Sequence, residues 1–108
     1  MAYFHKKLAG GRWKNFSRIE QLAHIGSEYN RFIHWSDKGN KENATHSFDR
    51  LIELVDLSVN DEKWKNSLAE LLRLREVICD KFSRGNNYNV SSKSLENYFL
   101  HFALIAKN

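Results

Sequence analysis

Three polar residues have side chains and spacing that would suit a metal ion. Glu20, His24 and Glu28 lie four residues apart, so a helix would align them along one side. Carboxylate and imidazole groups are metal ligands, but the same spacing is typical of a charged face turned to solvent. The Glu-x-x-His pairs of di-iron bundles and the His-Glu-x-x-His zinc motif do not occur. We therefore predict a solvated helix surface here, with no metal and no other cofactor.

A second polar line consists of Arg73, Glu76 and Asp80. At helical spacing these residues form a salt-bridged flank. We expect carboxylates of the preceding helix, Glu53 and Asp56, to face the arginines of this one. This arrangement predicts a structural role and no catalytic residue.

The N-terminal segment concentrates the positive charge of the chain. Residues 1–18 contain five Lys and Arg and no acidic residue; since the chain carries +4, residues 19–108 sum to −1. Cations neutralise phosphates, and aromatic rings between them stack on unpaired bases. The alternative is that Trp13 and Phe16 fold back over the bundle end. The predicted nucleic-acid-binding residues are Lys6, Lys7, Arg12, Trp13, Lys14 and Arg18.

Composition restricts the class of protein. The chain has 108 residues, 42% hydrophobic and 28% charged, proportions typical of one globular domain. It contains no proline and only five glycines, which favours helices over a turn-rich β fold. We find no apolar run long enough to span a bilayer and no secretory signal. The single cysteine, Cys79, excludes an intrachain disulfide, so we expect a cytoplasmic protein with no membrane partner.

Helix boundary signals divide the chain into four predicted helices. The first begins at Ser17, which forms a capping box with Glu20, and stops at Lys38–Gly39. The second starts at a cap on Asn40 and ends near residue 57. The third runs from an Asn60 cap to residues 84–85, and residues 85–89 form a loop. The fourth begins at residue 91 or 92 and extends through residue 105.

Apolar residues at spacings of three and four define the face that each helix buries. Gly26 lies on such a face, and a glycine there indicates close contact with the second or fourth helix. The predicted core positions are Leu22, Ile25, Gly26, Tyr29, Phe32 and Ile33; Ala44, Phe48, Leu51, Ile52 and Val55; Trp64, Leu68, Leu71, Leu72, Ile78 and Phe82; and Leu95, Tyr98, Phe99, Phe102 and Ile105.

Short connections make neighbouring helices antiparallel. The predicted fold is therefore all-α, a four-helix up-down bundle with a basic N-terminal arm. We assign residues 1–16 to the arm and residues 17–108 to the bundle domain.

Arg18 and His24 have the spacing Arg-x5-His, which resembles the Arg-x4–6-His motif of HEPN ribonucleases, also small helical bundles. The resemblance implies that both side chains act on an RNA phosphodiester, usually across a dimer. The chain departs from that family in two respects. Ile19 follows the arginine where a small or polar residue is usual, and the motif lies on the first helix instead of a late one.

A wider resemblance covers residues 11–103. The segments Gly-Arg-Trp from residue 11, Glu-Gln-Leu-Ala-His-Ile-Gly-Ser-Glu from residue 20, Trp-x-x-Lys-Gly-Asn from residue 35 and Phe-Asp-Arg-Leu-x-Glu-Leu-x-Asp-Leu from residue 48 are similar to a family of small uncharacterised prokaryotic proteins. The resemblance implies a compact helical domain and no catalytic residue. It also implies that Arg12 and Trp13 belong to the domain proper.

The sequence leaves three functions open, and the first is favoured because aromatic residues make up 13% of a small chain. The first is a non-enzymatic module that binds a protein partner or assembles with itself. The second is an accessory protein that binds RNA or single-stranded nucleic acid through the basic arm. The third is a ribonuclease of HEPN type.

Overall fold

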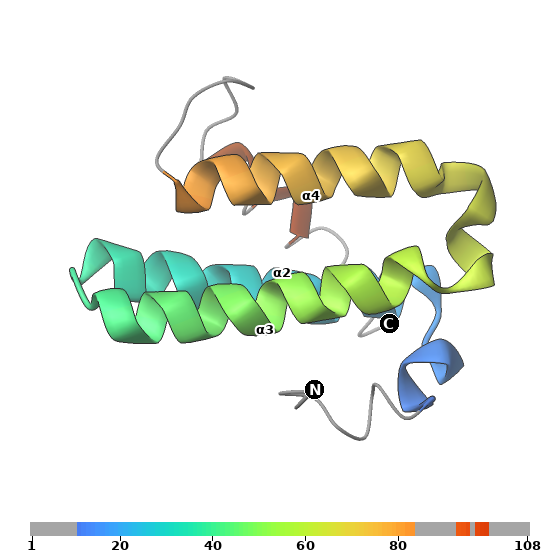
Figure 1. The fold of residues 1–108 in the computed structure, drawn as a ribbon, viewed down its shortest axis with the longest axis horizontal. Coiled ribbons are helices and arrows are strands. Elements are labelled where there is room, and N and C mark those ends of the chain that lie inside the picture. The colour runs from blue at the N-terminus through green and yellow to red at the C-terminus, as the bar shows by residue number, and fades with distance from the viewer. Residues whose placement is uncertain (1–10, 84–92, 96, 100–108) are drawn as a thin grey trace.

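The structure is a computed structural model that describes residues 11–83, 93–95 and 97–99. Its elements are η1 (Arg12–Asn15), α2 (Arg18–Asp37), α3 (Lys41–Val59), η2 (Glu62–Ser67) and α4 (Leu68–Phe82), where η marks a 3-10 helix. Residues 93–95 and 97–99 are also helical, and none of the described residues forms a strand. Figure 1 shows that α2, α3 and α4 run in alternating directions. The prediction of an all-α helical bundle is confirmed.

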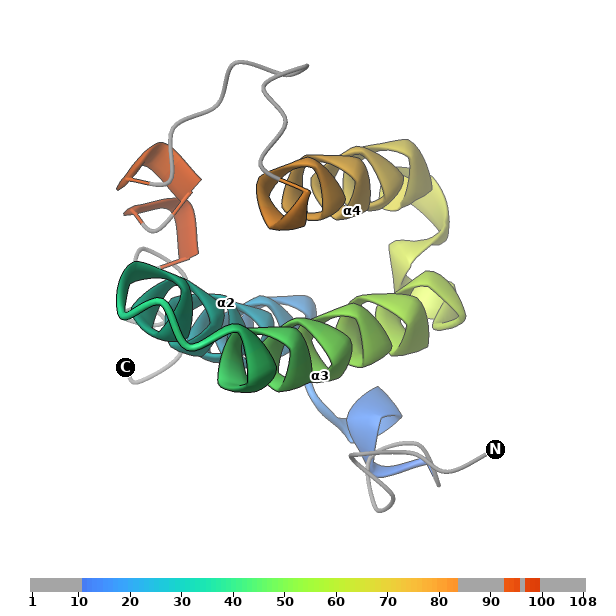
Figure 2. The same cartoon turned by 60° about the vertical axis from the view of Figure 1, so that its left-hand side comes forward.

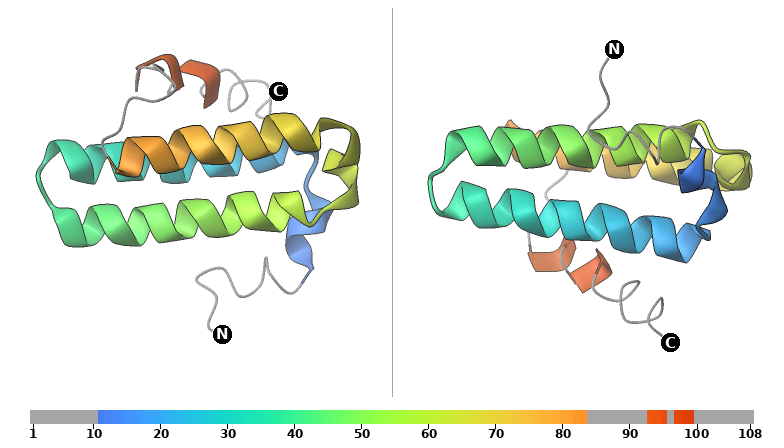
Figure 3. Two further views of the ribbon diagram at one scale, coloured as in Figure 1. Left: turned by 45° about the horizontal axis from the view of Figure 1, so that its top comes forward. Right: turned by 90° about the horizontal axis from the view of Figure 1, so that it is seen from below.

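The helices occupy the corners of a bundle. In Figure 2, α2 and α3 lie side by side, α4 lies above α3, and the helical residues near the C-terminus lie on the α2 side. Figure 3 shows η1 at the end of the bundle where α2 begins and α3 ends. The outer face between α3 and α4 is therefore on the opposite side of the molecule from residues 93–95 and 97–99.

Both predicted caps of the first helix pair are confirmed. The Ser17 side chain accepts from the Glu20 N–H and the Glu20 carboxylate accepts from the Ser17 N–H, which completes the capping box. Asn40 caps α3 by accepting from the Asn43 N–H. The turn between α2 and α3 requires Gly39, because its φ of +73° favours a residue without a side chain. These boundaries depend on local sequence alone.

The third predicted helix is wrong in its first two turns. Asn60 ends α3, with its N–H directed to the Asp56 and Ser58 carbonyls. Asp61 then caps η2, and α4 begins only at Leu68. The 3-10 segment changes the chain direction before α4 starts, and it buries Trp64, which is 6% exposed.

The core combines residues of η1, α2, α3, η2, α4 and the helical segment near the C-terminus. Of the predicted core positions, Ile33, Phe48 and Ile52 are partly buried. The prediction was wrong for Leu68, Leu72, Phe82 and Tyr98, which are among the exposed large hydrophobic side chains. Phe102 and Ile105 lie outside the described residues. The buried apolar residues are Trp13, Leu22, Ile25, Tyr29, Phe32, Ala44, Leu51, Leu54, Val55, Trp64, Leu71, Val77, Ile78, Leu95 and Phe99.

Gly26 makes the close contact that its position predicted. A Cβ added at residue 26 would overlap the Phe99 Cβ and lie 2.8 Å from the Phe99 Cγ. The neighbour is therefore the helical segment near the C-terminus, one of the two helices expected. The Phe99 ring, 1% exposed, also packs on Tyr29 with ring centroids 5.5 Å apart.

Candidate functional site

The predicted nucleic-acid-binding residues separate into three groups. Lys6 and Lys7 lie outside the described residues. Arg12, Lys14 and Arg18 are exposed, and we refer to these three residues as the basic face. Trp13 is buried between them.

The assignment of Trp13 to a nucleic-acid-binding arm is corrected by its burial. The side chain is 1% exposed, and its indole N–H donates to Ser58 Oγ over 3.0 Å. The Phe16 ring lies edge-on to it at 5.9 Å. No face of the indole is free to stack on a base, so Trp13 belongs to the core of the bundle.

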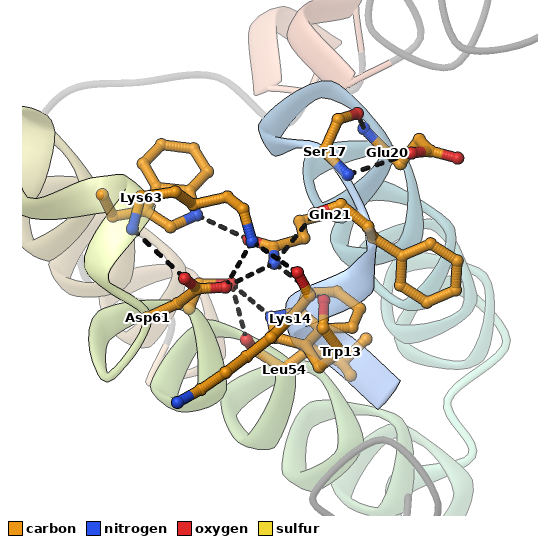
Figure 4. A network of polar contacts seen from close by, with 11 residues as sticks. Trp13, Lys14, Ser17, Glu20, Gln21, Leu54, Asp61 and Lys63 are labelled. Carbon is orange, nitrogen blue, oxygen red and sulfur yellow. Dashed lines mark hydrogen bonds and ion pairs between the residues drawn. The ribbon is translucent and has the colours of Figure 1, made fainter. Parts of the chain in front are cut away.

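Gln21 is the centre of a buried polar network that holds η1 in place (Figure 4). Its side chain is fully buried; the amide N–H groups donate to the Trp13 carbonyl over 3.0 Å and to Asp61 over 2.9 Å. The amide oxygen accepts from the Trp64 indole N–H over 2.6 Å. We call this set the Gln21 network, which comprises Trp13, Gln21, Ser58, Asp61, Lys63 and Trp64.

Lys63 connects the network to the backbone of η1. Its ammonium group donates to Asp61 over 2.7 Å and to the Lys14 carbonyl over 2.9 Å. Together with the bond from Gln21, this gives two consecutive carbonyls of η1 a partner from the bundle. The backbone of η1, which carries Arg12 and Lys14, is therefore held by hydrogen bonds to its carbonyl groups.

The network makes folding stability depend on pH through Asp61. Burial raises the pKa of Asp61, but the hydrogen bonds from Lys63 and Gln21 together outweigh burial, and the net pKa is below its ordinary 3.8. Because the folded-state pKa is depressed, this stabilisation is complete above the unfolded pKa and is lost as the pH falls below 3.8. We expect Asp61→Asn to lower stability at pH 7 and to flatten the acid limb of stability, measured by urea unfolding between pH 7 and pH 2.5. Parallel acid limbs in the two proteins would contradict this role.

The chemistry of the Gln21 network is structural. The Ser58 hydroxyl donates to the Leu54 carbonyl over 3.0 Å while it accepts from Trp13, so it is not activated as a nucleophile. Two clefts of about 380 and 300 Å³ in the described part of the chain are lined by other residues. The first lies against Phe32 and Phe82, and among the described residues its one charged lining residue is Lys41.

The second cleft lies between α4 and the helical residues near the C-terminus. It is lined by Glu70, Arg73, Leu74, Val77, Leu95 and Tyr98. Tyr98 is partly buried, and this loss of solvent raises the pKa of its phenol; the nearby Glu70 carboxylate raises the pKa further, as the smaller cause. A phenol with a raised pKa stays protonated at neutral pH, so Tyr98 is not prepared to act as a base.

Two of the three residues considered as metal ligands, Glu20 and Glu28, make other contacts in the structure. Glu20 is used in the capping box, which lowers its pKa through the hydrogen bond from the Ser17 N–H. The predicted solvated surface is wrong for Glu28, which is 5% exposed and pairs with Arg31 over 3.1 Å. Within the described ranges, no three His, Cys, Asp or Glu residues gather closely enough to hold a metal ion.

The proposed ribonuclease pair is divided between two sides of α2. His24 lies six positions after Arg18 on the helix, so the two side chains leave the axis about 120° apart. The His24 ring lies 4.7 Å from the Phe16 ring and 5.9 Å from Trp13. A ribonuclease function for this pair stays a prediction.

Three side chains of α4 that the helical period predicts for the core are exposed instead, namely Leu68, Leu72 and Phe82. Asp56 of α3 accepts from Arg75 of α4 over 2.8 and 3.4 Å, which confirms the expected pairing of the two helices. The Phe48 and Phe82 rings stack with centroids 4.0 Å apart. These two contacts fix the antiparallel register of α3 and α4.

The register places more apolar residues beside the ion pair. One turn from it, Val59 lies level with Leu72, and Ile52 lies level with Cys79. Leu72 is 40% exposed and Leu68, one turn earlier on the same side, is 36% exposed. Ile52, Val59 and Cys79 are partly buried. We call Ile52, Val59, Leu68, Leu72 and Cys79 the α3–α4 seam. Helical periodicity alone could not identify it, because periodicity shows that a helix has an apolar face but not which residues of that face a neighbouring helix buries.

No helix in the described part of the chain combines the length and apolar character needed to cross a bilayer. Comparison of the chain with protein-family models, curated proteins and solved structures gives no match. The resemblances to small prokaryotic proteins and to HEPN ribonucleases stay predictions.

Proposed function

We propose that this protein is a non-enzymatic self-assembly module in which the α3–α4 seam packs against the same seam of a second copy. The observation that carries the proposal is the exposure of Leu68 and Leu72, at 36% and 40%. These residues lie on one line of α4 beside the partly buried Val59 and Ile52. Fully burying an exposed leucine is worth about 1.5–3 kcal/mol, so covering the remaining exposed part of each of these two contributes on the order of 1 kcal/mol.

The charges at the seam suit a contact between identical surfaces. In a two-fold interface the same surface patch of both copies comes together, so a patch of one charge sign would repel its copy. Asp56 and Arg75 pair within the chain and remain 49% and 38% exposed in their side chains. Their opposite charges leave the seam without a net charge from this pair and provide polar groups for its rim.

The substitution Leu72→Glu tests this interface. It places a charge in the centre of the proposed contact, and we expect dimerisation to weaken at least 100-fold, because a charge buried without a partner costs several kcal/mol. Since Leu72 is exposed in the single chain, its thermal unfolding midpoint measured at low concentration is expected to stay within a few degrees of the parent. Sedimentation velocity over a range of concentrations measures the association.

Ile19→Glu is the matched control. Ile19 has nearly the same exposure, 37%, but lies in the first turn of α2 and away from the seam. We expect this variant to associate like the parent, whereas Leu72→Glu sediments as the 12.7 kDa monomer. Equal association of the parent and Leu72→Glu would overturn the proposed interface.

A further inference from the structure

The side chains of η1 divide between the core and solvent, which leaves cations exposed. Trp13 is buried, whereas its neighbours Arg12 and Lys14 are exposed, and Arg18 follows at the first position of α2. No acidic residue lies between residue 11 and Glu20. The Glu20 carboxylate accepts from the Ser17 N–H over 2.9 Å.

The basic face is held on a rigid support. The carbonyls of residues 13 and 14 accept from Gln21 and Lys63, over 3.0 and 2.9 Å. Gly11, with φ of +119°, sets the chain direction at the start of η1. An anion that binds here does not have to order the backbone, which removes one of the entropic costs of association.

We propose that the basic face, Arg12, Lys14 and Arg18, binds the sugar-phosphate backbone of a nucleic acid through charge, without contacts to the bases. Base stacking needs an aromatic ring with an open face. Trp13 is 1% exposed, and Phe16 is partly buried against Trp13 and His24. Phosphate contacts alone carry no sequence information. The site therefore tolerates any sequence, and it differs from the self-assembly surface in both place and chemistry.

The strength of such binding depends on salt. Three phosphate contacts predict that affinity for a single strand falls about 20-fold between 50 and 200 mM salt, and affinity for a duplex about 40-fold, because bound counterions are released. We also expect an oligomer without bases to bind as tightly as oligothymidine of the same length. Fluorescence anisotropy of labelled oligomers of about 20 nucleotides, titrated with the full chain, measures these affinities.

Two triple variants separate the basic face from net charge. Arg12→Gln, Lys14→Gln and Arg18→Gln together remove the proposed contacts, and Lys38→Gln, Lys41→Gln and Lys93→Gln together remove the same charge at exposed positions elsewhere. We expect the first variant to lose at least tenfold in affinity and to show a flatter salt dependence. We expect the second to lose less than threefold.

Three results would overturn the proposal. The first is no saturable binding at 50 mM salt, and the second is an equal loss of affinity in both triple variants. The third is failure of the base-free oligomer to bind, which would show that bases are contacted. Circular dichroism of both variants checks that the helices are intact, which is expected because all six substituted side chains are exposed.

Discussion

Replacing Trp13 by alanine is expected to lower the free energy of unfolding by about 3–5 kcal/mol. The indole is 1% exposed and lies between Ser58 of α3 and the start of α2, so its removal leaves a large cavity. Without the indole the backbone of residue 13 would be held less firmly, which weakens the hydrogen bond that its carbonyl accepts from Gln21. Urea unfolding followed by circular dichroism measures the change, and the melting temperature is expected to fall by more than about 12 °C.

Two milder substitutions serve as controls for Trp13→Ala. Trp13→Phe keeps an aromatic ring in the core but removes the hydrogen bond to Ser58 and part of the buried volume, so a loss of about 1–3 kcal/mol is expected. Lys14→Ala changes the exposed neighbour and is expected to cost less than about 0.5 kcal/mol. If Trp13→Ala costs no more than Lys14→Ala, then η1 does not belong to the folded bundle.

Gly26→Leu is expected to destabilise the protein by several kcal/mol, because the new side chain has no space beside Phe99. A Cβ alone would already overlap the Phe99 Cβ. Gly26→Ala is therefore a sharper test, because the close contact and helix propensity predict opposite signs for its change in stability. An alanine inside a helix normally adds about 1 kcal/mol over glycine, whereas here we expect a net loss. Thermal unfolding of both variants measures these effects.

Ser27→Ala is the control for Gly26. It is the next residue of the same helix, it is exposed, and its change tests helix propensity without the contact to Phe99. We expect Ser27→Ala to unfold at or slightly above the temperature of the parent. A Gly26→Leu variant that melts no earlier than the parent would show that α2 does not approach Phe99 closely.

The parts of the fold that local chemistry determines could be predicted from the sequence. The capping box of Ser17 and Glu20 and the cap at Asn40 involve residues three positions apart, so the sequence contains all the information. The close approach at Gly26 was also predictable, since a glycine on an apolar helix face lowers stability unless a neighbouring helix packs closely against it.

The start of α4 could not be predicted in the same way. Asn60 and Asp61 are both good caps, and local rules do not choose between the end of one helix and the start of the next. The deciding contact is the hydrogen bond from Trp64 to Gln21, 43 residues away. For Trp13 the sequence left two interpretations open, nucleic-acid binding and packing over the bundle end, and its burial against Ser58, 45 residues away, agrees with the second.

Of the two candidate surfaces, the basic face could be predicted from the sequence and the α3–α4 seam could not. The cations of the basic face are visible as charge in the sequence, and their exposure follows from the high cost of burying them. Leu68 and Leu72 fit the apolar period of α4, so the sequence placed them inside. Only the arrangement of α3 and α4, set by Asp56 with Arg75 and Phe48 with Phe82, shows that no described residue covers them fully.

The central claim is that the α3–α4 seam joins two copies of the chain, and the mass of the parent protein in solution tests it most directly. Light scattering after size exclusion, at rising concentrations and at low and high salt, measures that mass free of shape effects. Because an apolar contact is little screened by salt, we predict a mass that rises toward twice 12.7 kDa with concentration under both conditions. A mass that stays at 12.7 kDa at every concentration would contradict the claim.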